Sequence, residues 1–199
     1  MVELHLTGDA LWRRIERAVQ KVKDRVERVA TALDAAGVPY AIVGGNAVQI
    51  WVAPVDEAAV RHTRDVDILL GRDRLEDAAA ALVPADFAYR HAKSVDMFLD
   101  LREQPPKARD TVHVVFAGEK VRAADLVATP TLQRVERPKD FATLPLEDLV
   151  RMKLTSFRDK DRVHVRDMIE LGLLDDGWPS RFPSELAERL QELIDDPDG

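Results

Sequence analysis

Two adjacent glycines, Gly44 and Gly45, constrain the possible folds of this chain more than any other feature. The apolar, partly β-branched residues 40–43 before them predict a buried strand, and residues 46–51 after them can open a helix. Glycines at a strand-to-helix junction allow a tight turn and a close approach of the backbone to a ligand at the helix N-terminus. The sequence therefore predicts a strand, a glycine turn and a helix in that order.

A pair of acids follows this turn along the chain. Residues 66–70 predict a second strand, and Asp65 and Asp67 are separated by a single residue at its start. Because side chains alternate along a strand, both carboxylates are expected to project from one face. Two acids on one strand face, beside a glycine turn at a helix N-terminus, can hold a divalent cation and a nucleoside triphosphate (NTP) together.

The order of strand, Gly-Gly, helix, loop and Thr-Arg-Asp-x-Asp resembles the nucleotidyltransferases of the DNA polymerase β superfamily. The small bacterial group that includes the AbiEii-type toxins and the minimal nucleotidyltransferases is the most similar. The resemblance extends roughly over residues 37 to 172 and includes a C-terminal run in which Leu-Pro-Leu-Glu precedes Met-Lys-Leu and Arg-Asp-Lys-Asp. It implies an enzyme that uses Mg²⁺ or Mn²⁺ to move a nucleoside monophosphate from an NTP to a hydroxyl acceptor.

The resemblance also implies roles for individual residues. Asp65 and Asp67 would bind the metal ions, and the helix that opens after the glycines would bind the triphosphate. Arg64 would pair with phosphate or brace the acids. The residues implied in nucleotide binding are Gly44, Gly45, Asn46, Thr63, Arg64, Lys153, Lys160 and Asp161, with both lysines as phosphate contacts and Asp161 as a polar orienting group.

The third metal ligand is the point at which this chain departs from the resembled family. That family carries a third carboxylate on a later strand, in a short apolar run that ends in a glycine turn. Residues 112–118 match such a run, but they place His113 in the position of the acid. An imidazole suits Mn²⁺ or Zn²⁺ better than Mg²⁺, and it can alternatively serve as a general base. Asp96, in the predicted strand 95–100, is the alternative metal ligand, and the sequence leaves both possibilities open.

The complete chain is expected to have an α/β (α+β) fold, with a small mixed sheet flanked by helices. We predict an N-terminal helix within residues 1–36, a nucleotidyltransferase core over 37–139 and a C-terminal helical segment over 140–199. An apolar stripe along the first helix is expected to cover the sheet or, alternatively, to bind a partner helix. Its members are Leu11, Ile15, Val19, Val22, Val26, Val29 and Leu33.

The C-terminal segment predicts helices over 146–157, 161–172 and 184–195, the last with Ser184 as the N-cap. In the first of these helices, Lys153 shares a face with apolar residues, so it either extends past the edge of the core or points into a cleft.

Composition limits the partners and the location. The chain has 199 residues and no cysteine, which fits one domain, or one domain with a small appendage, without disulfides or thiolate metal sites. A net charge of −7 argues against non-specific coating of nucleic acid, although it allows a local basic groove. No apolar run approaches the roughly eighteen residues that a membrane span needs, and no signal peptide is recognisable, so a cytoplasmic location is expected.

Three functional hypotheses follow. The first is a nucleotidyltransferase whose acceptor is a tRNA end, another RNA, a protein side chain or a small molecule such as an aminoglycoside. The second is a toxin of a toxin–antitoxin system, held inactive by an antitoxin protein. The third is a noncatalytic nucleotide-binding module with a degenerate metal site.

Overall fold

The computed structural model describes residues 8–102, 110–138 and 140–196. The helices and strands, in chain order, are α1 (Gly8–Ala35), β1 (Tyr40–Val43), α2 (Gly44–Val52), β2 (Val66–Leu70), α3 (Leu75–Leu82), β3 (Phe87–Ala92), β4 (Val95–Asp100), β5 (Thr111–Phe116), α4 (Leu146–Ser156), α5 (Asp159–Glu170) and α6 (Ser184–Asp195). Short 3-10 helices lie at Arg72–Arg74, Val83–Ala85 and Trp178–Arg181. None of the described helices is both long enough and apolar enough to cross a membrane.

The strands form one sheet in the order β1-β2-β5-β4-β3. β2 and β5 are parallel, whereas the other neighbouring pairs are antiparallel. This arrangement confirms the predicted fold class, a small mixed sheet flanked by helices.

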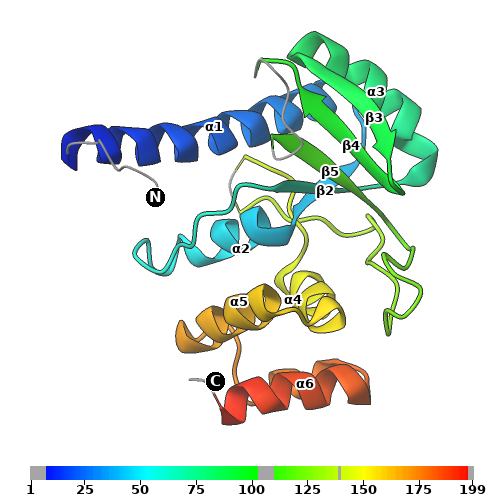
Figure 1. Cartoon of the computed structure of the whole chain (residues 1–199). Helices are drawn as coiled ribbons and strands as arrows, with labels where there is room; N and C mark the ends of the chain where they lie inside the picture. Colours follow the sequence, from blue (N-terminus) through cyan, green and yellow to red (C-terminus); the bar gives the residue numbers. More distant parts are fainter. Residues whose placement is uncertain (1–7, 103–109, 139, 197–199) are drawn as a thin grey trace.

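Helices cover both faces of the sheet (Figure 1). On one face, Asp100 of β4 forms ion pairs with Arg25 and Arg28 of α1, and α1 also contacts α3. On the other side, α2 contacts α4, which packs against α5 and α6. The C-terminal helices therefore lie next to the glycine turn that begins α2.

The apolar stripe of α1 is buried only in its C-terminal half. Val26, Val29 and Leu33 belong to the core, whereas Leu11 and Ile15 are both 42% exposed. In Figure 1 the N-terminal half of α1 extends beyond the sheet. The prediction that the whole stripe covers the sheet is therefore wrong for the first turns of the helix.

Two predicted helix starts also need correction. Pro183, rather than Ser184, occupies the N-cap position of α6, and no side chain caps this helix by a hydrogen bond. α5 begins at Asp159, two residues before the predicted start at 161. The difference in α5 matters for the site, because it places Lys160 and Asp161 in the first helical turn.

Candidate active site

Gly44 and Asp67 are packed against each other at the junction of β1 and α2. Val43, the last residue of β1, pairs with Asp67 of β2 in the antiparallel register. The next residue, Gly44, has a φ of +69°, and a Cβ atom added there would lie 2.1 Å from Oδ2 of Asp67. Only glycine fits this position, since a side chain would face both a strained backbone and a steric overlap. The carboxylate of Asp67 is thus held beside the first residue of α2.

Asn46 and Thr63 contribute to packing around this junction. The side chain of Asn46 is buried and donates a hydrogen bond of 2.7 Å from Nδ2 to the backbone oxygen of Asp65. A Cβ atom added at Gly45 would lie 2.9 Å from Cβ of Thr63. Asn46 and Thr63 therefore hold the segment before β2 against α2, next to Asp65 and Asp67.

The N-terminus of α2 has no side-chain cap. The N-cap residue is Val43, which offers no side-chain acceptor to the first backbone N–H groups of the helix. Such unpaired N–H groups, together with the helix dipole, favour an anion. Asp67 is adjacent, so an anionic ligand here needs a cation to bridge it to the carboxylates.

His113 lies directly opposite Asp67. The parallel register of β2 and β5 pairs the two residues, and Nδ1 of His113 is 3.4 Å from Oδ1 of Asp67. The hydrogen bond to Asp67 raises the pKa of His113 above its usual value, although partial burial opposes the rise. Nearby Asp65 raises the pKa further, and Lys160 lowers it. The structure thus brings Asp67 and His113 to one face of the sheet, with Asp65 close enough to influence the pKa of His113.

Asp96 is not brought to this face. His113 pairs with Met97 of β4, so Met97 shares the face of Asp67 and its neighbour Asp96 points to the opposite one. There Asp96 accepts hydrogen bonds from Tyr89 and His91. Burial raises the pKa of Asp96, but these hydrogen bonds outweigh that effect and lower it overall. Asp96 also belongs to the lining of the cavity described below, but its side chain lies on the opposite face of the sheet from Asp67 and His113, so this register does not favour it as the third ligand.

Lys153 is buried within the C-terminal helices. Its side chain is 6% exposed, and Nζ lies 3.1 Å from Oδ1 of Asp161 and 3.0 Å from Nδ1 of His164. Burial lowers the pKa of Lys153, and the negative charge of Asp161 opposes that shift. Asp161 also accepts a 2.8 Å hydrogen bond from Arg158. Burial raises the pKa of Asp161, but the two cations outweigh it, so that the pKa falls to about 2.

His164 has a defined role in this cluster. An ammonium group can only donate, so Nδ1 of His164 must accept and the imidazole must be neutral. Burial, followed by the charge of Lys153, lowers the pKa of His164 to about 4, which agrees with a neutral ring near pH 7. With Asp161 and His164 as two acceptors, Lys153 keeps one N–H for a further partner.

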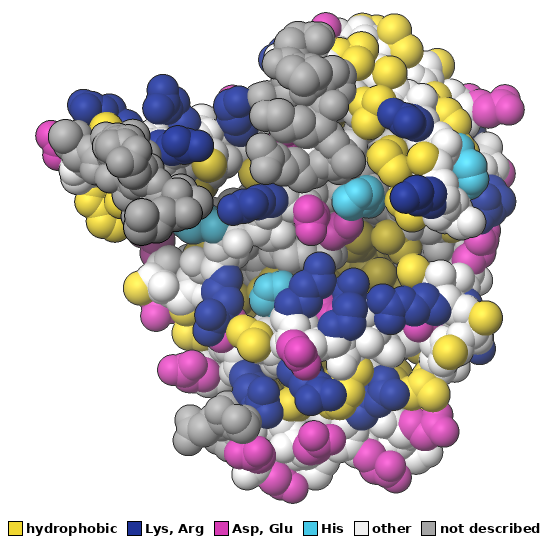
Figure 2. Space-filling model, viewed as in Figure 1, with side chains coloured by type: hydrophobic (Ala, Val, Ile, Leu, Met, Phe, Trp, Pro, Cys, Tyr) yellow, Lys and Arg dark blue, Asp and Glu magenta, His cyan; other side chains and the backbone are white. Residues whose placement is uncertain are grey.

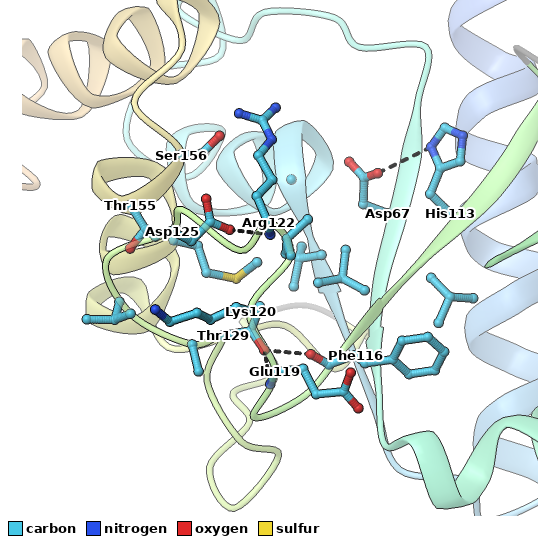
Figure 3. A pocket seen from close by; sticks show the side chains of 18 of the residues that line it. Asp67, His113, Phe116, Glu119, Lys120, Arg122, Asp125, Thr129, Thr155 and Ser156 are labelled. Atoms are coloured by element: carbon cyan, nitrogen blue, oxygen red, sulfur yellow. Dashed lines mark hydrogen bonds and ion pairs between the residues drawn. The ribbon is translucent and has the colours of Figure 1, made fainter. Parts of the chain in front are cut away.

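A cavity of about 500 Å³ lies between the sheet and the C-terminal helices. Gly44, Asp67 and His113 line it from the sheet side, whereas Lys153 and Arg158 line it from the helices. In Figure 2, basic side chains gather in a band across the middle of this face, next to acidic and histidine side chains. Figure 3 shows Lys120 and Arg122 projecting from the connection after β5 into the space between the sheet and α4.

Two predicted phosphate contacts lie outside the lining of this cavity. Lys160 is exposed at the start of α5, near enough to His113 to lower its pKa. Arg64 is also exposed, and within the described ranges its side chain forms no ion pair.

The donor set suits a divalent cation that is shared with a substrate. No group of three or more potential ligands in the described part of the chain has the arrangement of a complete metal site. Mg²⁺, however, is usually held by one or two carboxylates, with water and substrate phosphates in the remaining positions. Asp65 and Asp67 supply two carboxylates, and glycine at position 44 lets that of Asp67 lie against the start of α2. The residues present therefore fit Mg²⁺ or Mn²⁺ bound together with a phosphorylated ligand.

Comparison with known proteins supports the fold. No protein-family model matches the sequence, and no curated protein matches it. Among solved structures, an antigenic nucleotidyltransferase-like protein from Paracoccidioides brasiliensis is similar, with a TM-score of 0.56, 19% identity and coverage of 90% of each chain. The solution structure of the antibiotic-resistance factor ANT(2'')-Ia gives a TM-score of 0.47 and 13% identity, over 88% of this chain and 90% of that one. Its crystal structure in complex with adenylyl-2''-tobramycin gives 0.48 and 12%, over 85% and 94%.

Sequence reasoning missed three residues that line or support the cavity. His164, Lys120 and Arg122 are not among the site residues that the sequence predicts. The spacing of His164, three residues after Asp161 and eleven after Lys153, was the available signal for the first. No periodicity marks Lys120 or Arg122, because they lie in an irregular connection.

Proposed function

We propose that this chain is a metal-dependent nucleotidyltransferase that moves a nucleoside monophosphate from an NTP to a hydroxyl acceptor. The observation that carries the proposal is the packing of Asp67 against Gly44 at an uncapped helix N-terminus, facing a cavity with basic walls. In the reaction the acceptor oxygen forms a bond to the α-phosphorus, the bond to pyrophosphate breaks with its electron pair on the leaving pyrophosphate, and the proton of the acceptor hydroxyl passes to solvent. A divalent cation, when bound, would neutralise phosphate charge and orient the reacting oxygens.

The protein groups divide this work between the two walls of the cavity. Asp65 and Asp67 would provide the carboxylates for the cation, and His113 would hold Asp67 through the contact between Nδ1 and Oδ1. The N–H groups at the start of α2 would bind phosphate oxygens. From the opposite wall, Lys153 would donate its remaining N–H to a phosphate, held in place by Asp161 and His164.

The test is the transfer of radiolabel from α-labelled NTPs to RNA, protein and hydroxyl-bearing small molecules, with Mg²⁺ or Mn²⁺. The wild type is expected to transfer label, whereas Asp65→Asn and Asp67→Asn are expected to lose transfer with an unchanged melting temperature. Glu188→Gln, an exposed substitution on α6, is the matched control. Transfer by Asp67→Asn at the wild-type rate would rule out the assigned chemistry.

A noncatalytic nucleotide-binding module would behave differently in the same experiment. It would bind a nonhydrolysable NTP in a metal-dependent manner, measured by calorimetry, without transferring label to any acceptor. The imidazole in the position of the third carboxylate is the observation that favours this alternative, because it removes an anionic ligand from the site.

A toxin of the AbiEii type is a second candidate function with the same chemistry. The observation that favours it is the exposure of large apolar side chains on the projecting part of α1, since an antitoxin would need such a surface: Leu11, Trp12 and Ile15 are 42%, 63% and 42% exposed. Induced expression of the wild type would then arrest growth, and Asp67→Asn would relieve the arrest. Equal growth of both strains would exclude the toxin role.

A further inference from the structure

The connection after β5 forms a loop that is closed at its neck, here called the 118–130 loop. Gly118 donates its backbone N–H to the oxygen of Pro130 at 3.1 Å, and Thr129 donates to Glu119 at 2.9 Å. The hydroxyl of Thr129 also donates to the backbone oxygen of Phe116, the last residue of β5, at 2.6 Å. These hydrogen bonds fix both ends of the loop to the end of the strand.

Arg72, which lies outside the loop, makes a second set of contacts with the start of the loop and the end of β5. Arg72 donates two hydrogen bonds of 2.7 Å to the carboxylate of Glu119. Its guanidinium also lies over the ring of Phe116, 3.7 Å from the centroid. Bidentate pairing and stacking orient an arginine more tightly than a single contact does. The start of the 118–130 loop is thus attached to the segment that follows β2.

The tip of the loop has its own internal structure. The backbone N–H of Arg122 donates to Oδ2 of Asp125 at 2.8 Å, and Asp125 donates its N–H to the oxygen of Arg122 at 3.0 Å. These reciprocal bonds form a turn around Arg122. The loop therefore presents Lys120 and Arg122 from a defined backbone, which lowers the entropy lost when a ligand binds.

Lys120 and Arg122 differ from the other cations around the cavity in their pairing. Lys153 and Arg158 share the carboxylate of Asp161, and Arg72 is paired with Glu119. The side chains of Lys120 and Arg122 are exposed, and no acid among the described residues forms an ion pair with either of them. Both line the same cavity as Asp67, and Figure 3 shows them extending into it. Their charges are therefore available to an anionic ligand.

We propose that the 118–130 loop is a polyphosphate clamp, in which Lys120 and Arg122 bind the terminal phosphates of the NTP. This inference rests on the proposed function. The α-phosphate must reach the carboxylates at Asp65 and Asp67, so the β- and γ-phosphates extend into the remaining cavity. Mg²⁺ neutralises only part of the triphosphate charge, and an arginine together with a lysine supplies the charge-assisted hydrogen bonds for the rest.

The experiment measures binding of a nonhydrolysable NTP and of inorganic tripolyphosphate by calorimetry in Mg²⁺. The proteins are the wild type, Lys120→Ala, Arg122→Ala, the double variant and Arg122→Lys. Arg134→Ala, an exposed arginine further along the same connection and outside the cavity lining, is the control. Each alanine substitution is expected to raise the dissociation constants of both ligands about tenfold, and the double variant should raise them about a hundredfold. Arg122→Lys should retain most of the affinity, and Arg134→Ala should stay within about twofold.

The outcomes separate this proposal from the proposed function. If the variants bind both ligands as the wild type does, while Asp67→Asn loses transfer, the clamp is wrong and the nucleotidyltransferase stands. If the variants bind the NTP more weakly but bind tripolyphosphate as the wild type does, the loop contacts the nucleoside rather than the phosphates. This result would also contradict the proposed clamp. If the wild type binds neither ligand, the proposed function fails together with the clamp.

Discussion

Oδ2 of Asp67 lies 2.1 Å from the point where residue 44 would carry a Cβ atom. The carboxylate and the start of α2 can be this close only because residue 44 is glycine. Asp67 also faces His113 across the sheet, so its position is determined from two neighbouring strands. The position of the Asp67 carboxylate and that of the N-terminus of α2 therefore depend on each other, and a substitution at residue 44 would displace the carboxylate.

Gly44→Ala is expected to abolish nucleotide transfer, because the new methyl group would displace the Asp67 carboxylate. The positive φ should add a loss of about 1–2 kcal/mol in the free energy of unfolding. Gly172→Ala is the matched control, since Gly172 also has a φ of +69° and no atom lies within 4 Å of its added Cβ. Denaturant unfolding and label transfer measure the two effects. Full activity in Gly44→Ala would contradict the close packing described here.

His113→Asp tests the residue that stands where the resembled family has a third acid. The new carboxylate would lie opposite Asp67 and add a hard oxygen donor, so the activity with Mg²⁺ should rise relative to that with Mn²⁺. A fall in activity with both metals would instead indicate that the imidazole acts in the reaction. Asp96→Asn, on the opposite face of the sheet, should leave the metal dependence unchanged. Metal titrations of the three proteins provide the measurement.

Lys153 and Lys160 have the same predicted role from the sequence, but the structure separates them. Lys153→Met should remove about 2–4 kcal/mol from the free energy of unfolding, because it leaves the buried carboxylate of Asp161 with Arg158 as its remaining cation. Lys160→Met, at an exposed position, should change stability by less than about 0.5 kcal/mol. Thermal and urea unfolding distinguish the two. Equal stability of both variants would show that Lys153 is not a buried partner of Asp161.

The low pKa of His164 predicts a loss of stability in mild acid. Between about pH 6.5 and about pH 4 the unfolded chain binds a proton at residue 164 that the folded chain does not, so the free energy of unfolding decreases as the pH falls. With partial screening by solvent, the loss should be on the order of 1–2 kcal/mol. His164→Asn keeps an acceptor for Lys153 and removes the titration, so its stability should vary less across this window.

The acid effect of His164 can be separated from that of Asp161. The pKa of Asp161 is lowered to about 2, so its contribution is present above its usual value of 3.8 and is lost only as the pH falls from there toward 2. The raised pKa of His113 acts in the opposite direction as the pH falls toward 6.5, but equally in both proteins, so the difference between the wild type and His164→Asn in urea unfolding at pH 7, 5.5 and 4.5 reports on His164. An identical pH slope in the wild type and His164→Asn would contradict the assignment.

The sequence by itself determined the local order of elements around the site. The apolar run before Gly44, the helix after it and the strand that begins beside Asp65 and Asp67 all follow from short-range preferences, namely burial, glycine conformation and side-chain alternation. The C-terminal helices could be predicted for the same reason. These features depend on neighbouring residues, which a single sequence displays directly.

Tertiary structure alone decided which distant groups meet. The register between β2 and β5 sets His113 opposite Asp67, and the register of β4 turns Asp96 to the other face. Packing of α4 against α5 encloses Lys153 with Asp161, so that a predicted phosphate contact is also a buried ion pair. Strand register and helix packing are set by the burial of the entire core, and one step in register reverses the face of every side chain. No local pattern can therefore specify them.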